Sequence, residues 1–367
     1  MEKYNIFDYI KWRGDLSFKV KSFNMLDALS LTMIAFIDFS KEMENYPTTK
    51  TILMKKMYAK FMKENDISKL QLGLLLPNDI YELGKLMESS YRYQKIEASN
   101  YINSIDMKIT KQFSAMTYHI DKNTIFIAFR GTDDTLIGWA EDVNMLCTYP
   151  IPAQKDALEY LTKISELFPN SKIYIGGHSK GGNIAVYAAV NASEEIKERI
   201  QEVYSFDGPG FYEDTLGQEK LDTIKDKIIH ILPNSSVIGR IYHLDVDQMI
   251  VNSFSKGIDQ HNPLTWEIRR DHFVRVEKFD THSNKIKKEI DALIASLDQA
   301  EKEDFANDLT NFVDSLDKNH LIDFLNLGNL ISLLSNKYWM KHKNLRRLFK
   351  LYMILYRNKA IVVKIQQ

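Results

Sequence analysis

The chain has 367 residues, of which 44% are hydrophobic and 26% charged, with a formal net charge of −1 at pH 7. This composition is typical of a folded protein with a sizeable core, and the near-zero charge argues against nucleic acid as the main partner. The single cysteine, Cys147, excludes a disulfide framework and a zinc site built on cysteines.

The first residues predict neither a secretory signal nor a membrane anchor. No basic segment followed by an apolar stretch is present there. The apolar run 26–39 contains Asp27 and Asp38 and is too short to span a bilayer. We therefore expect a cytoplasmic protein, with export by a route without a cleaved signal left open.

Taken in chain order, residues 1 to about 105 predict a mostly helical segment, with apolar residues at helical spacing between 26 and 37. Strand-like runs at 112–118 and 124–129 surround a polar turn and indicate a hairpin. A helix is expected between Pro152 and Pro169. Four further strands are predicted at 172–176, 203–206, 227–232 and 248–254. Strands that alternate with helices favour a largely parallel sheet.

Near residue 285 the pattern changes to helices that continue to the end of the chain. We divide the chain into a domain of residues 1–284, which includes the helical segment 1–105, and a helical C-terminal region, 285–367. Residues 337–364 carry nine Lys or Arg and no acid. One interpretation is that this basic segment contacts an anionic membrane or an acidic partner. The other, which we prefer, is that it packs on the acidic helices of its own chain.

The strongest catalytic signal is Gly177-His178-Ser179-Lys180-Gly181, which fits G-x-S-x-G. It lies between an apolar strand and a helix rich in small residues, as a nucleophile elbow requires. In such a turn the serine has a strained backbone, and larger flanking side chains would collide with neighbouring backbone. The helix that follows directs N–H groups towards a developing oxyanion. Ser179 is therefore the predicted nucleophile.

Motifs on both sides of this turn resemble the class 3, or fungal-type, lipases over residues 110–262. Phe129-Arg130-Gly131-Thr132 is followed by Trp139 and Asp142, and Ser205-Phe206-Asp207-Gly208-Pro209 is similar to the Thr-Phe-Gly-x-Pro of that group. A bacterial branch known mainly as a domain of unknown function is closer still. The residues that carry this second likeness are Phe7 to Asp15, Gln260-His261-Asn262-Pro263 and Trp266.

The resemblance implies an α/β-hydrolase fold with a mostly parallel central sheet, and ester hydrolysis without cofactor or metal. It gives Thr132 a place in the oxyanion hole through its backbone N–H, with its hydroxyl as a further candidate donor, and Lys180 the second N–H. Losing one such donor typically costs ~10²–10³ in rate. Arg130 is expected to pair with Asp133 or Asp142 and to shape the turn.

The general base should be a histidine beyond the last strands, because the chain order in this fold is Ser, acid, His. The candidates are His230, His243, His261, His272 and His282. We predict His261, which follows the strand 248–254 and a loop, with His272 next. His230 lies within an apolar strand pattern and is expected to be buried and structural.

The position of the triad acid differs from the lipase pattern, because Ser236 occupies the place where the lipases carry this acid. Either another residue supplies the carboxylate or the triad is degraded. Asp207, Asp245 and Asp247 are candidates. We predict Asp207, because it follows a strand that should end at the same sheet edge as Ser179.

The leading interpretation is an esterase or lipase-like serine hydrolase that acts on a small acyl ester or a lipid through an acyl-enzyme on Ser179. A thioesterase or peptidase with the same triad stays open, because pocket shape decides the substrate. A catalytically silent hydrolase-fold module for binding, or a membrane-associated interaction protein, are the alternatives. The oligomeric state is left open.

Overall fold

The computed structural model describes residues 2–304, apart from 47, 49, 71, 73–75, 134, 146–147, 213–214, 297, 299 and 302–303. Cys147 and most of the predicted C-terminal region, including the basic segment 337–364, lie outside the described residues. No helix in the described part is long and apolar enough to cross a membrane.

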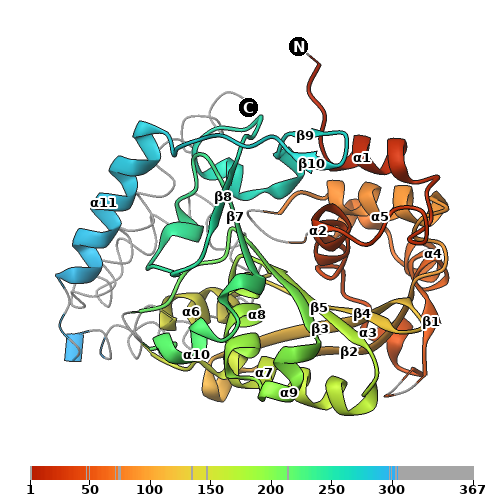
Figure 1. The fold of residues 1–367 in the computed structure, drawn as a ribbon, viewed down its shortest axis with the longest axis horizontal. Helices are drawn as coiled ribbons and strands as arrows, with labels where there is room; N and C mark the ends of the chain where they lie inside the picture. Colours follow the sequence, from red (N-terminus) through yellow and green to blue (C-terminus); the bar gives the residue numbers. More distant parts are fainter. Residues whose placement is uncertain are drawn as a thin grey trace.

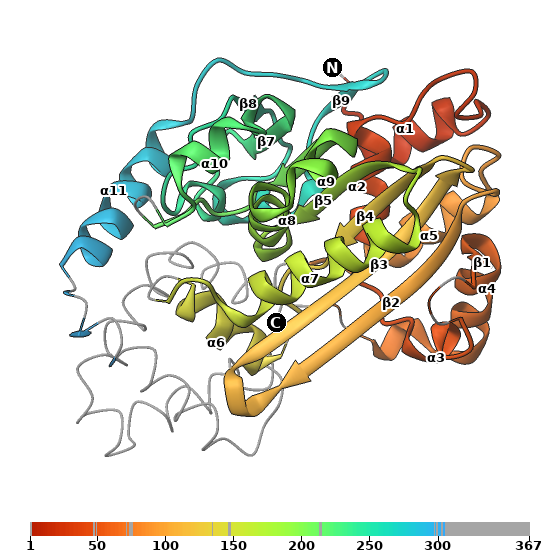
Figure 2. The same cartoon turned by 60° about the horizontal axis from the view of Figure 1, so that its bottom comes forward.

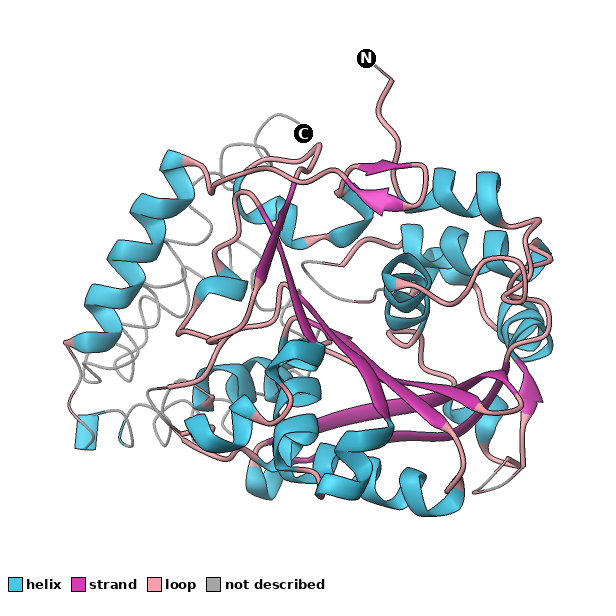
Figure 3. Ribbon diagram, in the orientation of Figure 1, coloured by secondary structure: helices cyan, strands magenta, loops and turns pink. Residues whose placement is uncertain are grey.

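An eight-stranded sheet forms the centre of the molecule, with its strands in sequence order (Figures 1 and 3). The strands are β1 (Ile52–Leu53), β2 (Glu97–Asp106), β3 (Lys111–Asp121), β4 (Thr124–Phe129), β5 (Lys172–His178), β6 (Ile200–Phe206), β7 (Ile228–Pro233) and β8 (Gln248–Val251). The first four pair antiparallel. From β4 onward every pairing is parallel, so the carboxyl ends of β4 to β8 meet at one edge.

Helices cover both faces of this sheet. The N-terminal helices are α1 (Ile6–Arg13), α2 (Met25–Ile34), α3 (Ser40–Met43), α4 (Met54–Glu64) and α5 (Asp79–Ser89). The later helices are α6 (Leu136–Asn144), α7 (Pro152–Leu167), α8 (Lys180–Asn191), α9 (Glu194–Arg199), α10 (Gln218–Asp222) and α11 (Thr281–Ala295). Figure 2 shows α7 lying across the sheet beside β3, on the side away from α2.

The sheet separates two hydrophobic cores, because successive side chains along its strands point to opposite faces. In β4, Phe126 and Ala128 pack with the N-terminal helices, whereas Ile125, Ile127 and Phe129 pack with α7 and α8. Successive side chains of a strand point to opposite faces, so a strand that is apolar throughout must be covered on both sides.

The predicted elements are present, with shifted ends. The hairpin is β3 and β4, and the predicted strands 172–176, 203–206, 227–232 and 248–254 correspond to β5, β6, β7 and β8. The N-terminal segment is mostly helical, but its last part forms β2, whose pattern of partial burial gives little period-two signal. The helix α11 begins before the predicted boundary at residue 285 and packs through Ile290 on Val237 and Ile258.

Candidate active site

Ser179 lies in a sharp turn between β5 and α8. Its backbone has φ 58° and ψ −129°, in a region that residues with a side chain rarely adopt. A residue persists in such a conformation only where its surroundings enforce it, and such sites are frequently functional. Lys180 is the first residue of α8, so its backbone N–H has no acceptor within the helix and lies at the positive end of the helix dipole.

Glycines allow this turn to pack against the end of β4. A Cβ on Gly181 would lie 2.3 Å from the carbonyl oxygen of Phe129, and one on Gly177 would lie 2.2 Å from the backbone of Gly181. A Cβ on Gly131 would lie 2.4 Å from the carbonyl oxygen of His178 and 3.4 Å from the Cβ of Ser179. The turn that carries Thr132 therefore lies against the turn that carries Ser179.

The structure brings His261 and Asp207 together. His261 Nδ1 lies 2.6 Å from Asp207 Oδ2, and the two residues are 4% and 1% exposed. Asp207 directly follows β6, with its backbone at φ 47°, which Asp tolerates better than most residues. His261 ends a short 3₁₀ helix, Gly257–His261, after β8. A carboxylate that accepts the Nδ1 proton leaves Nε2 as the basic nitrogen.

The other candidates lie elsewhere. His230 is buried in β7 with Nε2 3.0 Å from the Gly208 carbonyl oxygen, and burial lowers its pKa to about 4, so it is structural as expected. His272 is exposed and pairs with Asp271. Asp245 and Asp247 are exposed, and Asp245 lies beside the exposed His243.

The loop that carries His261 is tied to the core at several points. His178 Nε2 lies 2.7 Å from the His261 carbonyl oxygen, and the two rings are 4.5 Å apart. Burial lowers the pKa of His178 well below its usual range, so the ring is neutral and donates through Nε2. The fully buried Trp266 donates its indole N–H to the Gln260 carbonyl oxygen at 2.7 Å. These bonds restrict the position of the imidazole.

Two adjacent acids of α6 hold the residues expected to supply the oxyanion hole. The hydroxyl of Thr132 donates to the carboxylate of Asp142, at 2.6 and 2.7 Å from its two oxygens. Burial raises the pKa of Asp142 to about 6, although Lys180 and the bond from Thr132 favour the ionised form. Glu141 accepts from the buried ammonium of Lys180 at 2.7 Å, and Gln112 supplies two further acceptors for that ammonium.

Arg130 pairs with Asp133 at 3.0 Å, one of its two expected partners, and also donates to Asn103. The sequence places His178 in the nucleophile motif and Ser236 where the lipase acid is expected, but it does not predict the contacts that these two residues and Glu141 make here. Their roles depend on contacts between loops, which periodicity does not encode.

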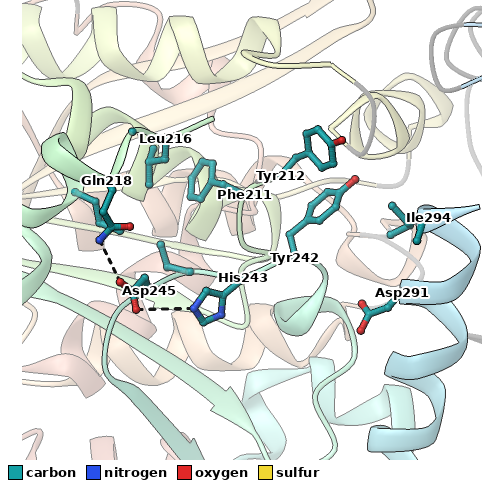
Figure 4. A pocket seen from close by; sticks show the side chains of 13 residues that line it. Phe211, Tyr212, Leu216, Gln218, Tyr242, His243, Asp245, Asp291 and Ile294 are labelled. Atoms are coloured by element: carbon teal, nitrogen blue, oxygen red, sulfur yellow. Dashed lines mark hydrogen bonds and ion pairs between the residues drawn. The ribbon is translucent and has the colours of Figure 1, made fainter. Parts of the chain in front are cut away.

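A separate hollow of about 660 Å³ lies between the loop after Asp207, the loop before β8, and α11 (Figure 4). Tyr212 and Tyr242 project towards the side where α11 carries Asp291 and Ile294. Neither Ser179 nor His261 is among the described residues that line it. The hollow is therefore distinct from the cluster around His261.

Solved structures similar to this chain include several fungal lipases, all at low identity. The Rhizomucor miehei lipase–propeptide complex is 16% identical, with a TM-score of 0.33 over 43% of this chain and 57% of that chain. The lipase of Rhizopus microsporus var. chinensis is 12% identical, with a TM-score of 0.37 over 70% and 81% of the two chains. This chain thus spans little more than half the length of the Rhizomucor protein. No curated protein matches it in sequence. The Mbeg1-like family model matches residues 87–311, and the chain belongs to the Mbeg1-like family.

Proposed function

We propose that this chain is an α/β-hydrolase that cleaves acyl esters through an acyl-enzyme on Ser179. The observation that carries the proposal is the buried hydrogen bond between His261 and Asp207, at the sheet edge where the strained Ser179 turn also lies. A serine hydroxyl becomes an effective nucleophile when an oriented, neutral imidazole takes its proton.

In the proposed reaction, Ser179 Oγ attacks the ester carbonyl carbon while His261 Nε2 takes the hydroxyl proton. His261 then returns this proton to the leaving alcohol as the C–O bond breaks. Water, activated by the same nitrogen, hydrolyses the acyl-enzyme and restores Ser179. Asp207 orients the imidazole and stabilises the imidazolium that forms transiently. This sequence needs no cofactor.

The charge that develops on the carbonyl oxygen needs N–H donors. We assign these to the backbones of Thr132 and Lys180, supported by the packing of Gly131 on the Ser179 turn and by the position of Lys180 at the start of α8. The part-buried bond from Thr132 to Asp142 and the buried bond from Lys180 to Glu141 support a rigid hole. Donors held in advance stabilise a transition state without reorganisation. The substrate is a small acyl ester or a lipid.

A fluorophosphonate probe tests the nucleophile. Purified full-length protein should gain the mass of one probe adduct, and Ser179→Ala should gain none. Ser193→Ala, at an exposed serine that caps α9, is the matched control and should label like the wild type. Equal labelling of Ser179→Ala and wild type would reject the assignment. No labelling of any of the three, with no hydrolysis of 4-nitrophenyl esters from acetate to palmitate, would favour a silent binding module.

A further inference from the structure

The second oxygen of the Asp207 carboxylate has its own partner. Oδ2 accepts from His261, whereas Oδ1 accepts from the hydroxyl of Ser236 at 2.5 Å. Ser236 is 2% exposed, so solvent cannot replace this bond. We infer that Ser236 is a positioning residue that sets the orientation and charge of Asp207 for His261. This inference rests on the proposed function.

One hydrogen bond does not fix a carboxylate. The torsion about the Cβ–Cγ bond of Asp has broad, two-fold minima, so a carboxylate held at one oxygen can still turn. A donor on each oxygen defines the carboxylate plane, and therefore the direction in which His261 Nδ1–H points. A buried carboxylate oxygen without a donor would also be unfavourable in itself. The Ser236 hydroxyl meets both requirements at Oδ1.

The backbone around Ser236 holds its hydroxyl in place. Its N–H donates to the Pro233 carbonyl oxygen at 2.8 Å, which closes a turn at the end of β7. The neighbouring Ser235 N–H donates to the side chain of Gln260 at 2.8 Å. Gln260 directly precedes His261, so the same turn is connected to the acid on one side and to the base loop on the other.

Gly239 closes the remaining side of Oδ1. A Cβ at this position would lie 2.3 Å from Asp207 Oδ1 and 2.4 Å from a methyl carbon of Leu232. The carboxylate is thus confined between a hydroxyl, an imidazole and a glycine backbone.

Other ionisable groups near the pair bear on its pH dependence. The His178 ring is 4.5 Å from the His261 ring and is neutral. Burial lowers the pKa values of His230 and Arg240, and the charge of Asp207 opposes both shifts. Burial raises the pKa of Asp142, a shift that His261 opposes. None of these groups hydrogen-bonds to Asp207 Oδ1 in the described structure. Removing the Ser236 hydroxyl therefore takes a donor from Oδ1 that none of them replaces.

The test compares Ser236→Ala and Ser236→Thr with Ser235→Ala. Ser235 is a matched control, because it is the adjacent residue, is buried, and donates its hydroxyl to Asp280 instead of Asp207. Hydrolysis of 4-nitrophenyl butyrate is measured from pH 5 to 10. Ser236→Ala should lose about ten- to a hundredfold in kcat, with KM changed less than about threefold, as expected for loss of a hydrogen bond to a charged group.

The pH profile of kcat/KM should also change in Ser236→Ala, because the carboxylate that orients His261 has lost one of its two donors. Ser236→Thr, which retains the hydroxyl, should recover most of the activity. Ser235→Ala should lose thermal stability while keeping kcat and the pH profile. If Ser236→Ala matches Ser235→Ala in kcat and pH profile, Ser236 is merely structural and the inference is overturned.

A spectroscopic readout separates this inference from the proposed function. The proton on His261 Nδ1 should give a strongly downfield NMR resonance that shifts in Ser236→Ala and not in Ser235→Ala. This measurement needs no substrate. A shift in a protein that labels no probe would retain the coupling of Ser236 to the Asp207–His261 pair, and would reject the hydrolase together with any role of this coupling in catalysis. An active enzyme whose resonance is unchanged in Ser236→Ala would retain the hydrolase and reject the Ser236 inference.

Discussion

Asp207→Asn tests the proposed acid while disturbing the structure little. Asn tolerates the positive φ of this position as well as Asp does. Its amide oxygen can still accept from His261 Nδ1, and its NH₂ can donate to the Ser236 hydroxyl, which can accept as well as donate. The substitution therefore removes the negative charge and keeps both hydrogen bonds. We expect a folded protein with low turnover.

The size of the loss follows from the geometry of the pair. His261 Nδ1 and Asp207 Oδ2 are 2.6 Å apart and both residues are buried. With charge centres about 4 Å apart and an effective dielectric constant of about 20, a carboxylate stabilises an imidazolium by about 4 kcal/mol. At about 1.4 kcal/mol per factor of ten, this corresponds to a fall of roughly 10³ in kcat. The upper limit for such a change is ~10⁴.

The assay is steady-state hydrolysis of one activated ester, with folding checked by circular dichroism and thermal unfolding. Asp245→Asn and Asp247→Asn are matched controls, because these carboxylates are exposed and Asp245 pairs with His243 instead of His261. Both should stay within about twofold of wild type, as surface changes usually do. A folded Asp207→Asn with near-normal kcat would refute the assignment. A large loss in either control would move the acid to that residue.

Two further predictions follow from groups around the site. Gly239→Ala should displace Asp207 and lower kcat at least about tenfold, with a loss of about 1–3 kcal/mol in stability from overpacking. Gly217→Ala, whose nearest neighbour would be 3.9 Å away but whose φ is 79°, should lose stability through backbone strain and keep kcat. Equal kcat in the two variants would contradict the packing argument. Burial raises the pKa of Asp142 to about 6, so the native state binds a proton more readily than the unfolded chain. The cost in stability therefore builds up between about pH 4 and 6 and is fully present above pH 6. Asp142→Asn should therefore unfold at a higher temperature than wild type at pH 8, lose this advantage as the pH falls to about 4, and have a lower kcat. Equal melting temperatures at pH 8 would be inconsistent with an ionised Asp142 that destabilises the fold.

The fold was largely predictable because local signals and burial agree. The strand before Ser179 is largely apolar, Gly177 and Gly181 lie two positions before and after the serine, and the helix that follows is rich in small residues. Each of these features lies within one short stretch of sequence. The strand β2 was missed because it pairs at the antiparallel side of the sheet and is only partly buried, so tertiary pairing rather than sequence pattern decides its conformation.

The site was less predictable because its parts meet through loops. Ser179 could be proposed from its own neighbours in the sequence, and His261 from its place after β8. The anchors of the site, His178 on the His261 carbonyl and Glu141 on Lys180, join residues 83 and 39 positions apart. No spacing rule covers such contacts, because loop conformations decide which side chains meet.

The position of the acid illustrates this limit. The strands β6 and β7 are parallel neighbours, and the Asp207 N–H donates to the carbonyl oxygen of Ile231 in β7. The residues that follow the two strands therefore reach the same point, where Asp207 and Ser236 meet at 2.5 Å. Either strand end could present a carboxylate to His261, while two carboxylates there would repel each other. With Asp after β6, a neutral donor after β7 is the arrangement that satisfies both oxygens, so a serine at 236 is consistent with an intact acid rather than a degraded one.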